Sequence, residues 1–190
     1  MPIGQAKFGL LGGVADLGKL ELISTQTVSS VSFIDFKESD GTFDTSYGVH
    51  FLQYSNFQVS VDNTENYIRF YESGVLETAS VYQYAYQYGR ANATQGDVQS
   101  TAQDKLFCSS GLGTAGNETG SGYHYFYNLG NSSKYSFITS HWYNIEASGV
   151  PVYVFGSGVL PQASTVDGIR VYPNSGTVSG TASLYGIAES

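Results

Sequence analysis

The regular alternation of tyrosine with smaller side chains is the sequence feature that most constrains the fold of this chain. In the run SVYQYAYQYGR, tyrosine recurs at every second position, as Tyr82, Tyr84, Tyr86 and Tyr88. Successive side chains of a β-strand point to opposite faces of a sheet, so these rings should share one face of one strand. The run YHYFY at 123–127 repeats the pattern. The period of two therefore predicts β-structure in both places.

Similar alternating runs recur along residues 19–190, and no stretch shows a persuasive helical period. We count about eight to ten of them, at intervals of about 10–15 residues. The composition agrees, because the chain has 16 Tyr, 11 Phe and 23 Gly while charged residues make up only 13%. We find no internal repeat of the kind that builds a propeller. The chain is therefore predicted to be all-β, with a single jelly-roll-like β-sandwich of about eight to ten antiparallel strands over 19–190.

Two stretches stand outside this pattern. Residues 1–18 are rich in Gly and small apolar residues, so we expect an irregular N-terminal arm. Its candidate docking residues are Phe8, Leu10 and Leu11, which would contact another subunit or a larger assembly. The alternative is an arm that packs on its own domain or stays mobile. Residues 91–122 are polar and Gly-rich, and we expect a long loop there, where function or variation often lies.

The last quarter of the chain shows the alternation in two short runs. Ile and Val alternate with Arg and Tyr over 169–172, and Ala, Leu and Gly alternate with Ser, Tyr and Ile over 182–187. Between them, the Pro-Asn-Ser-Gly sequence at 173–176 supplies the restricted or positive φ angles with which a chain reverses. We therefore expect a closing β-hairpin over 165–187 that ties the C-terminus into a sheet.

Charge and composition exclude several classes of partner. The formal net charge of −8 and the pI near 4.6 argue against nucleic acid, which needs a basic surface. No run approaches the ~20 apolar residues that span a membrane, and no secretory leader is evident, so we expect no membrane partner and synthesis in a cytoplasm. The GLGTAG sequence at 111–116 has the spacing of a dinucleotide fingerprint, but polar loop residues follow it instead of a helix. We therefore predict no cofactor.

Catalytic and metal-binding groups are equally sparse. His50, His124 and His141 lie in strand patterns without a metal-ligand spacing, and the acidic stretch 40–44 does not complete a calcium loop. No nucleophile-elbow, zinc-protease or cysteine-protease motif occurs. Cys108 lacks an activating neighbour, which favours a buried, unreactive thiol. We therefore predict no catalytic residue and no metal site, and a protein that is not an enzyme.

The aromatic strand faces are the best candidates for a binding surface. Tyrosine combines a large apolar ring with a polar tip, which suits both sugar stacking and protein interfaces. The same rings could instead fill the core of the sandwich or a seam between subunits, and the sequence leaves these alternatives open. The candidate residues for a ligand or subunit interface are Tyr82, Tyr84, Tyr86, Tyr88, Tyr123, Tyr125 and Trp142.

Two segments resemble virion proteins of tailed bacteriophages. The sequence FYESGVLETASVYQYAYQ at 70–87 looks like their short strand, acidic-Ser-Gly turn and aromatic strand. The sequence VDGIRVYPNSGTVSGTASLYGI at 166–187 is similar to their ending, with a Gly-Ile-Arg-hydrophobic-Tyr strand, a Ser-Gly turn and a final Leu-Tyr-Gly-Ile. The resemblance covers 19–187 and is weakest across 91–122.

This resemblance implies a phage structural protein with a jelly-roll-like β-sandwich, of a kind assigned to tail fibres or other surface appendages and typically trimeric. We accordingly expect a virion component, a homotrimer that contacts other phage virion proteins through residues 1–18. It could decorate the capsid or form part of a tail fibre. The alternative is a glycan-binding host-attachment module that holds a host surface glycan on its tyrosine-rich strand faces.

Overall fold

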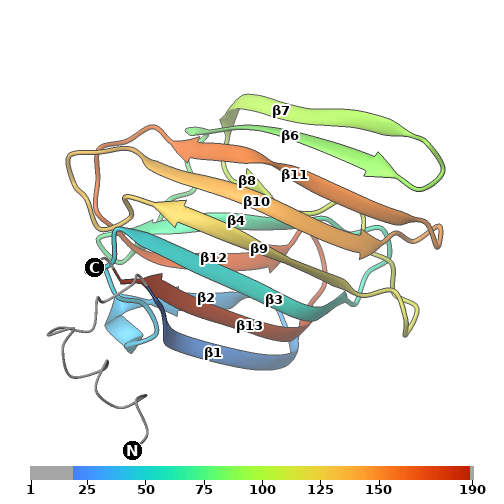
Figure 1. Ribbon diagram of the computed structural model, residues 1–190, viewed down its shortest axis with the longest axis horizontal. Coiled ribbons are helices and arrows are strands. Elements are labelled where there is room, and N and C mark those ends of the chain that lie inside the picture. Colours follow the sequence, from blue (N-terminus) through green and yellow to red (C-terminus); the bar gives the residue numbers. More distant parts are fainter. Residues whose placement is uncertain (1–18, 189–190) are drawn as a thin grey trace, which may run out of the picture.

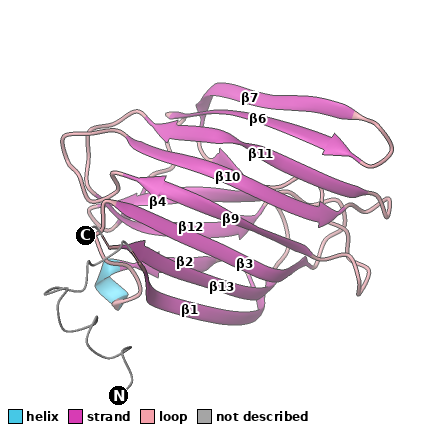
Figure 2. Cartoon of the chain, in the orientation of Figure 1, coloured by secondary structure: helices cyan, strands magenta, loops and turns pink. Residues whose placement is uncertain are grey.

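The computed structural model describes residues 19–188, which form β-strands, the turns between them and one short helical turn (Figure 2). The predicted arm at 1–18, with Phe8, Leu10 and Leu11, lies outside the described residues. Two antiparallel sheets pack face to face (Figure 1). The prediction of an all-β sandwich is confirmed. The strands of this range, β1 to β13, are more numerous than the predicted total of about eight to ten.

The larger sheet has eight strands in the order β1-β13-β3-β9-β10-β11-β6-β7. The first and last strands in the chain pair with each other, from Leu20 opposite Ile187 to Val31 opposite Val178. This pairing leaves β1 at one edge and β7 at the other (Figure 1). The strands are β1 (Leu20–Val31), β3 (Val49–Val59), β6 (Tyr82–Arg90), β7 (Gln95–Gln103), β9 (Gly120–Tyr127), β10 (Ser136–Ile145), β11 (Pro151–Leu160) and β13 (Val178–Ile187).

The smaller sheet has the order β2-β12-β4-β5, and the short strand β8 also pairs with β4. A single turn of 3-10 helix, η1 (Glu38–Asp40), follows β2 and ends at Gly41, whose φ of 68° favours glycine. The jelly-roll connectivity that we expected remains a prediction. The strands of this sheet are β2 (Ile34–Lys37), β4 (Asn66–Glu72), β5 (Val75–Leu76), β8 (Leu106–Phe107) and β12 (Val166–Pro173).

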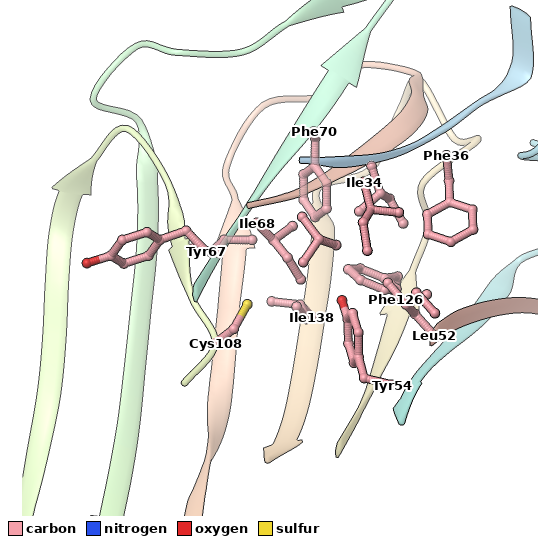
Figure 3. Packing of buried hydrophobic residues seen from close by; sticks show 14 of the residues in the cluster. Ile34, Phe36, Leu52, Tyr54, Tyr67, Ile68, Phe70, Cys108, Phe126 and Ile138 are labelled. Carbon is pink, nitrogen blue, oxygen red and sulfur yellow. The ribbon is translucent and has the colours of Figure 1, made fainter. Parts of the chain in front are cut away.

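The core lies between the sheets, because each strand turns alternate side chains inward. Figure 3 shows aromatic and aliphatic residues of both sheets meeting there. Register aligns the inward residues of neighbouring strands into rows, as where Leu184 of β13, Leu52 of β3 and His124 of β9 lie side by side. The cluster includes Ile34, Phe36, Ile68 and Phe70 from the smaller sheet and Leu52, Tyr54, Phe126 and Ile138 from the larger.

The closing stretch is not the β-hairpin that we predicted. β12 pairs with β2 and β4 in the smaller sheet, whereas β13 pairs with β1 and β3 in the larger. The turn at 174–177 therefore crosses from one sheet to the other, with Gly176 at a φ of 74°. Ile169 and Leu184 are both fully buried, as the alternation indicated, but they enter the core from opposite sheets. Alternation fixes which side chains of a strand share a face; it does not say whether two successive strands pair or oppose each other.

The predicted long loop at 91–122 is wrong over much of its length. β7 occupies Gln95–Gln103, β8 occupies Leu106–Phe107, and β9 begins at Gly120. β7 carries Gln, Asp, Ser and Thr at most positions because it is an edge strand with only one neighbour, β6, and few of its side chains are covered. A strand that buries little apolar surface shows little hydrophobic alternation, so its sequence has the composition of a loop.

Candidate interaction surface

The tyrosines of β6 line the core instead of an open binding surface. Tyr82 and Tyr86 are 0% and 2% exposed, and Tyr84 and Tyr88 are half-buried beside them. The backbone N–H of Phe70, on the smaller sheet, donates to the Tyr82 hydroxyl at 2.9 Å and satisfies that buried polar tip. The core alternative therefore holds for Tyr82 and Tyr86.

Trp142 of β10 is also a core residue. Its side chain is 1% exposed and meets the rings of Tyr54 and Phe57 edge-on, at centroid distances of 5.1 and 5.6 Å. A Cβ atom at Gly120 of β9 would lie 2.7 Å from Cζ2 of the indole, so glycine at that position leaves room for the ring. Trp142 is covered on all sides in the folded chain and is not open to a ligand.

Tyr123 and Tyr125 of β9 point the other way. The residues that alternate with them, His124 and Phe126, are fully buried. Tyr123 is 38% exposed and Tyr125 is half-buried, and both lie on the side of the larger sheet that faces away from the core. Two runs with the same tyrosine alternation, β6 and β9, thus present their rings to opposite faces of one sheet.

Aromatic rings of five adjacent strands gather on this outer side, which we call the aromatic outer face. Tyr185 pairs with Phe51 and Phe51 with Tyr125, so these rings form a row across three strands. Tyr143 pairs with Tyr153 further along. The aromatic outer face consists of Phe51 (β3), Tyr123 and Tyr125 (β9), Phe137 and Tyr143 (β10), Tyr153 and Phe155 (β11), and Tyr185 (β13).

The rings of the aromatic outer face touch one another. Phe51 lies 4.9 Å from Tyr125 and 6.0 Å from Tyr185, centroid to centroid, in tilted arrangements. Tyr153 and Phe155 stack at 6.0 Å with an angle of 18° between their planes. The two groups of rings adjoin across His141, which lies in register between Tyr123 and Phe155. Contiguous apolar patches of this kind on a folded chain mark interaction sites.

No formal charge stands at the outward positions of the strands from β13 to β6. One row reads Ser183, Gln53, Tyr123, His141 and Phe155 in register, and the others likewise hold aromatic, aliphatic, hydroxyl, amide and glycine residues. The first outward carboxylate belongs to the edge strand β7. A chain with a net charge of −8 thus keeps its acids off one broad surface. Contact there removes no charged group from water, which would be costly.

A shallow hollow lies near the centre of this face. It has a volume of about 490 Å³ and is lined by Tyr123, Tyr125, Thr139, His141 and Phe155. The Tyr123 hydroxyl and Nδ1 of His141 are 3.4 Å apart at its wall. A second hollow, of about 270 Å³, adjoins it along Tyr123. Ring faces beside hydroxyl and imidazole groups are the chemistry with which proteins hold sugars as well as other proteins.

Three titratable groups are sealed in the core. Nδ1 of His124 lies 2.7 Å from the Ser140 hydroxyl, and burial lowers the pKa of His124 to about 3. Nε2 of His50 lies 2.7 Å from the Asp44 carbonyl oxygen, and burial lowers the pKa of His50 as well. Cys108 is 1% exposed, and burial raises the pKa of its thiol, which confirms the prediction of a buried cysteine.

Among residues 19–188, no group of three or more His, Cys, Asp or Glu side chains is arranged to hold a metal ion. The carboxylates of the acidic loop at 40–44 instead pair with nearby groups of the protein. Lys37 Nζ lies 3.0 Å from the Asp40 carboxylate, and the backbone N–H of Ser46 donates to Asp44 at 2.9 Å. In the same described range, no helix is long and apolar enough to cross a membrane.

Sequence reasoning missed most of the aromatic outer face, since only Tyr123 and Tyr125 were among its candidates. Strand β10 shows why. Its buried residues at alternate positions are Ser, Ile, Ser, Trp and Asn, and its outward residues are Phe, Thr, His, Tyr and Ile. The outward set is no less apolar than the buried set, so alternation alone cannot tell which side of the strand faces the second sheet.

Comparison with known proteins does not place this chain in a family. No protein-family model and no curated protein matches it. The fold and the aromatic outer face are therefore the observations from which its function is argued.

Proposed function

We propose that this chain is a structural protein of a tailed-bacteriophage virion, which acts by contact with other proteins and not by catalysis. The resemblance of segments 70–87 and 166–187 to such virion proteins supports the assignment. The observation that carries the contact role is the aromatic outer face, a broad uncharged surface on an acidic chain. A sandwich of two paired sheets fixes the rings of that surface in place.

In this proposal the chain is a homotrimer that decorates the capsid or forms part of a tail fibre, after synthesis in the host cytoplasm. It attaches to other virion proteins through residues 1–18, with Phe8, Leu10 and Leu11 as anchors. A trimer has three times the mass of the 20.4 kDa chain, which light scattering measures directly. Closed cyclic assemblies of this kind are common among homo-oligomers.

Purified particles test the proposal. We expect mass spectrometry to find the chain in them, and gold-labelled antibody to place it on the head or the tail. A chain abundant in the infected lysate but missing from purified particles would refute the virion assignment. Deletion of residues 1–18 should abolish incorporation while circular dichroism still reports a folded β-protein. The full-length variant in which Phe8, Leu10 and Leu11 are changed to Ser should fail to incorporate in the same way, which would assign the loss to these side chains and not to the shortened chain.

A glycan-binding host-attachment module is the second candidate, and the hollow beside Tyr123 and His141 favours it. A glycan array would show a ligand for the wild-type chain if this candidate holds. The variant Tyr123→Ala should lose that ligand, because a stacking ring is removed from an exposed position. Tyr84→Ala is the matched control, since Tyr84 belongs to the inner face and its loss should leave glycan binding unchanged. An array without any signal would remove this candidate.

A further inference from the structure

The aromatic outer face lies within a wider uncharged surface that has the size of a stable protein–protein contact. The uncharged outward positions run across seven strands, from β1 to β6, and along each strand from the row of Leu20 and Tyr127 to that of Tyr143 and Tyr153. Strand and residue spacings give this surface an area of roughly 600 to 900 Å². A standard interface takes about 800 Å² from each partner. The surface is thus wide enough to cover a protein partner and much wider than one sugar ring.

The charge distribution indicates which protein could cover it. Two copies of a chain with a net charge of −8 repel each other over most approaches. The aromatic outer face is a surface on which this repulsion is locally absent, because no carboxylate stands at its outward positions between β13 and β6. A neighbouring copy can therefore cover this face without burying a carboxylate of the face itself.

The arrangement of the rings also suits a protein better than a sugar. Phe51 is tilted by 44° against Tyr125 and by 44° against Tyr185, so its ring packs against its neighbours within the surface. Sugar stacking uses a ring plane that lies open. Tyr143, the most exposed ring of the face at 60%, carries a hydroxyl, but Phe155 and Phe137 come next at 44% and 43% and offer none to a sugar. Aromatic clusters of this composition are enriched at the centres of protein interfaces.

We infer that the aromatic outer face is the surface through which copies of this chain assemble, and that a second copy covers it. The inference rests on the proposed function, since it supplies the contact that an oligomeric virion protein needs. In a closed trimer each contact is heterologous, so the aromatic outer face of one copy meets a different surface of the next. Phe155 lies at the wall of the central hollow and should be covered in the assembly.

Two variants at one position test the inference. Phe155→Lys and Phe155→Glu place opposite charges at the centre of the face, where a covering copy would bury either of them. Val75→Lys is the matched control, because Val75 is 70% exposed on β5 of the other sheet. Sedimentation velocity of the full-length proteins over a range of concentrations measures association, and circular dichroism with urea unfolding shows that each variant is folded.

We expect the wild type and Val75→Lys to be oligomers, and the dissociation constant of both Phe155 variants to rise at least about 100-fold. A monomeric wild type would overturn the inference, as would Phe155 variants that associate like the wild type. Dissociation by Glu alone would overturn it too, because it would report net charge and not burial. If a glycan bound the monomeric wild type but not Phe155→Lys, the aromatic outer face would be a glycan-binding site instead. Incorporation into particles is scored separately, so a monomer found in virions refutes this inference and leaves the proposed function standing.

Discussion

His124 makes the stability of the sandwich depend on pH in a way that can be worked out from the structure. The imidazole is fully buried in the core, with Nδ1 bonded to Ser140 and with the Tyr54 and Trp142 rings at 5.3 and 6.5 Å. Nε2 has no hydrogen-bond partner. Protonation of His124 would therefore place in the core a positive charge and an Nε2–H donor that has no acceptor. Burial accordingly lowers the pKa of His124 to about 3, from the 6.5 of a free imidazole.

The sign of the effect follows from where the proton binds. Between pH 6.5 and pH 3 the unfolded chain takes up a proton on His124 that the folded chain refuses. This contribution to the free energy of unfolding is therefore fully present above pH 6.5 and is lost as the pH falls. One pKa unit corresponds to about 1.36 kcal/mol, so the whole shift amounts to about 5 kcal/mol. About pH 5 lies less than halfway from pH 6.5 to the folded-state pKa, so the expected loss in the free energy of unfolding there is about 2 kcal/mol.

The assay is urea unfolding at about pH 7.5 and about pH 5, followed by the fluorescence of Trp142, the one tryptophan in the sequence. The comparison variant is His124→Asn, whose amide can replace Nδ1 in the bond to Ser140 but does not titrate. We expect this variant to be less stable than the wild type at the higher pH. Its further loss on acidification should be smaller than the wild-type loss by about 2 kcal/mol.

The difference between the two proteins isolates His124. His50 is also buried with a lowered pKa, and burial raises the pKa of Glu72, which acts in the opposite direction, but both groups are present in each protein and cancel. Equal protein concentrations keep the contribution of any assembly the same. If both proteins lost the same free energy between the two pH values, the folded core would accept the proton and the reasoning would be refuted.

Three further predictions concern the core and its rim. Trp142→Ala should destabilise the fold by about 3–5 kcal/mol in urea unfolding followed by circular dichroism, because the indole is fully buried. Asp35→Asn should cost about 2 kcal/mol in the same assay, because the Asp35 carboxylate accepts two bonds from Arg170 at 2.8 and 2.7 Å; an equally stable variant would contradict this. A disulfide reagent should label Cys108 about 1,000-fold or more slowly in the native protein than in urea, since labelling requires unfolding.

The sequence allowed the burial pattern within strands to be predicted better than the partnership between them. Ile169 and Val171 are buried as their alternation indicated, because a strand of period two has one covered face. The pairing of β12 and β13 was wrong, because the turn at 174–177 can either close a hairpin or cross to the opposite sheet. That choice depends on β2, β3 and β4, which lie more than a hundred residues away in the chain. Local propensity carries no such information.

The position of the aromatic outer face could not be predicted for the same reason, because it too depends on contacts between strands. β6 and β9 carry equal tyrosine alternations, and the side of the sheet on which each set lies is decided by what stands opposite. On β9 the alternate set begins with Gly120 and Gly122, where a Cβ would lie 2.7 Å from Cζ2 and 2.9 Å from Cε3 of the Trp142 indole, respectively. The glycine side of β9 leaves room for the buried indole, and Tyr123 and Tyr125 face outward.

On β6 the alternate set is Gln83, Ala85 and Gln87, and the neighbouring core has space for rings. Tyr82 and Tyr86 fill this space. Burial of their rings stabilises the fold, whereas a buried glutamine would need hydrogen-bond partners for its amide. The volume already occupied by Trp142 thus favours the outer side of the sheet for Tyr123 and Tyr125. The aromatic outer face arises from packing on the other side of the same sheet, and its prediction would require the register of β9 against β10.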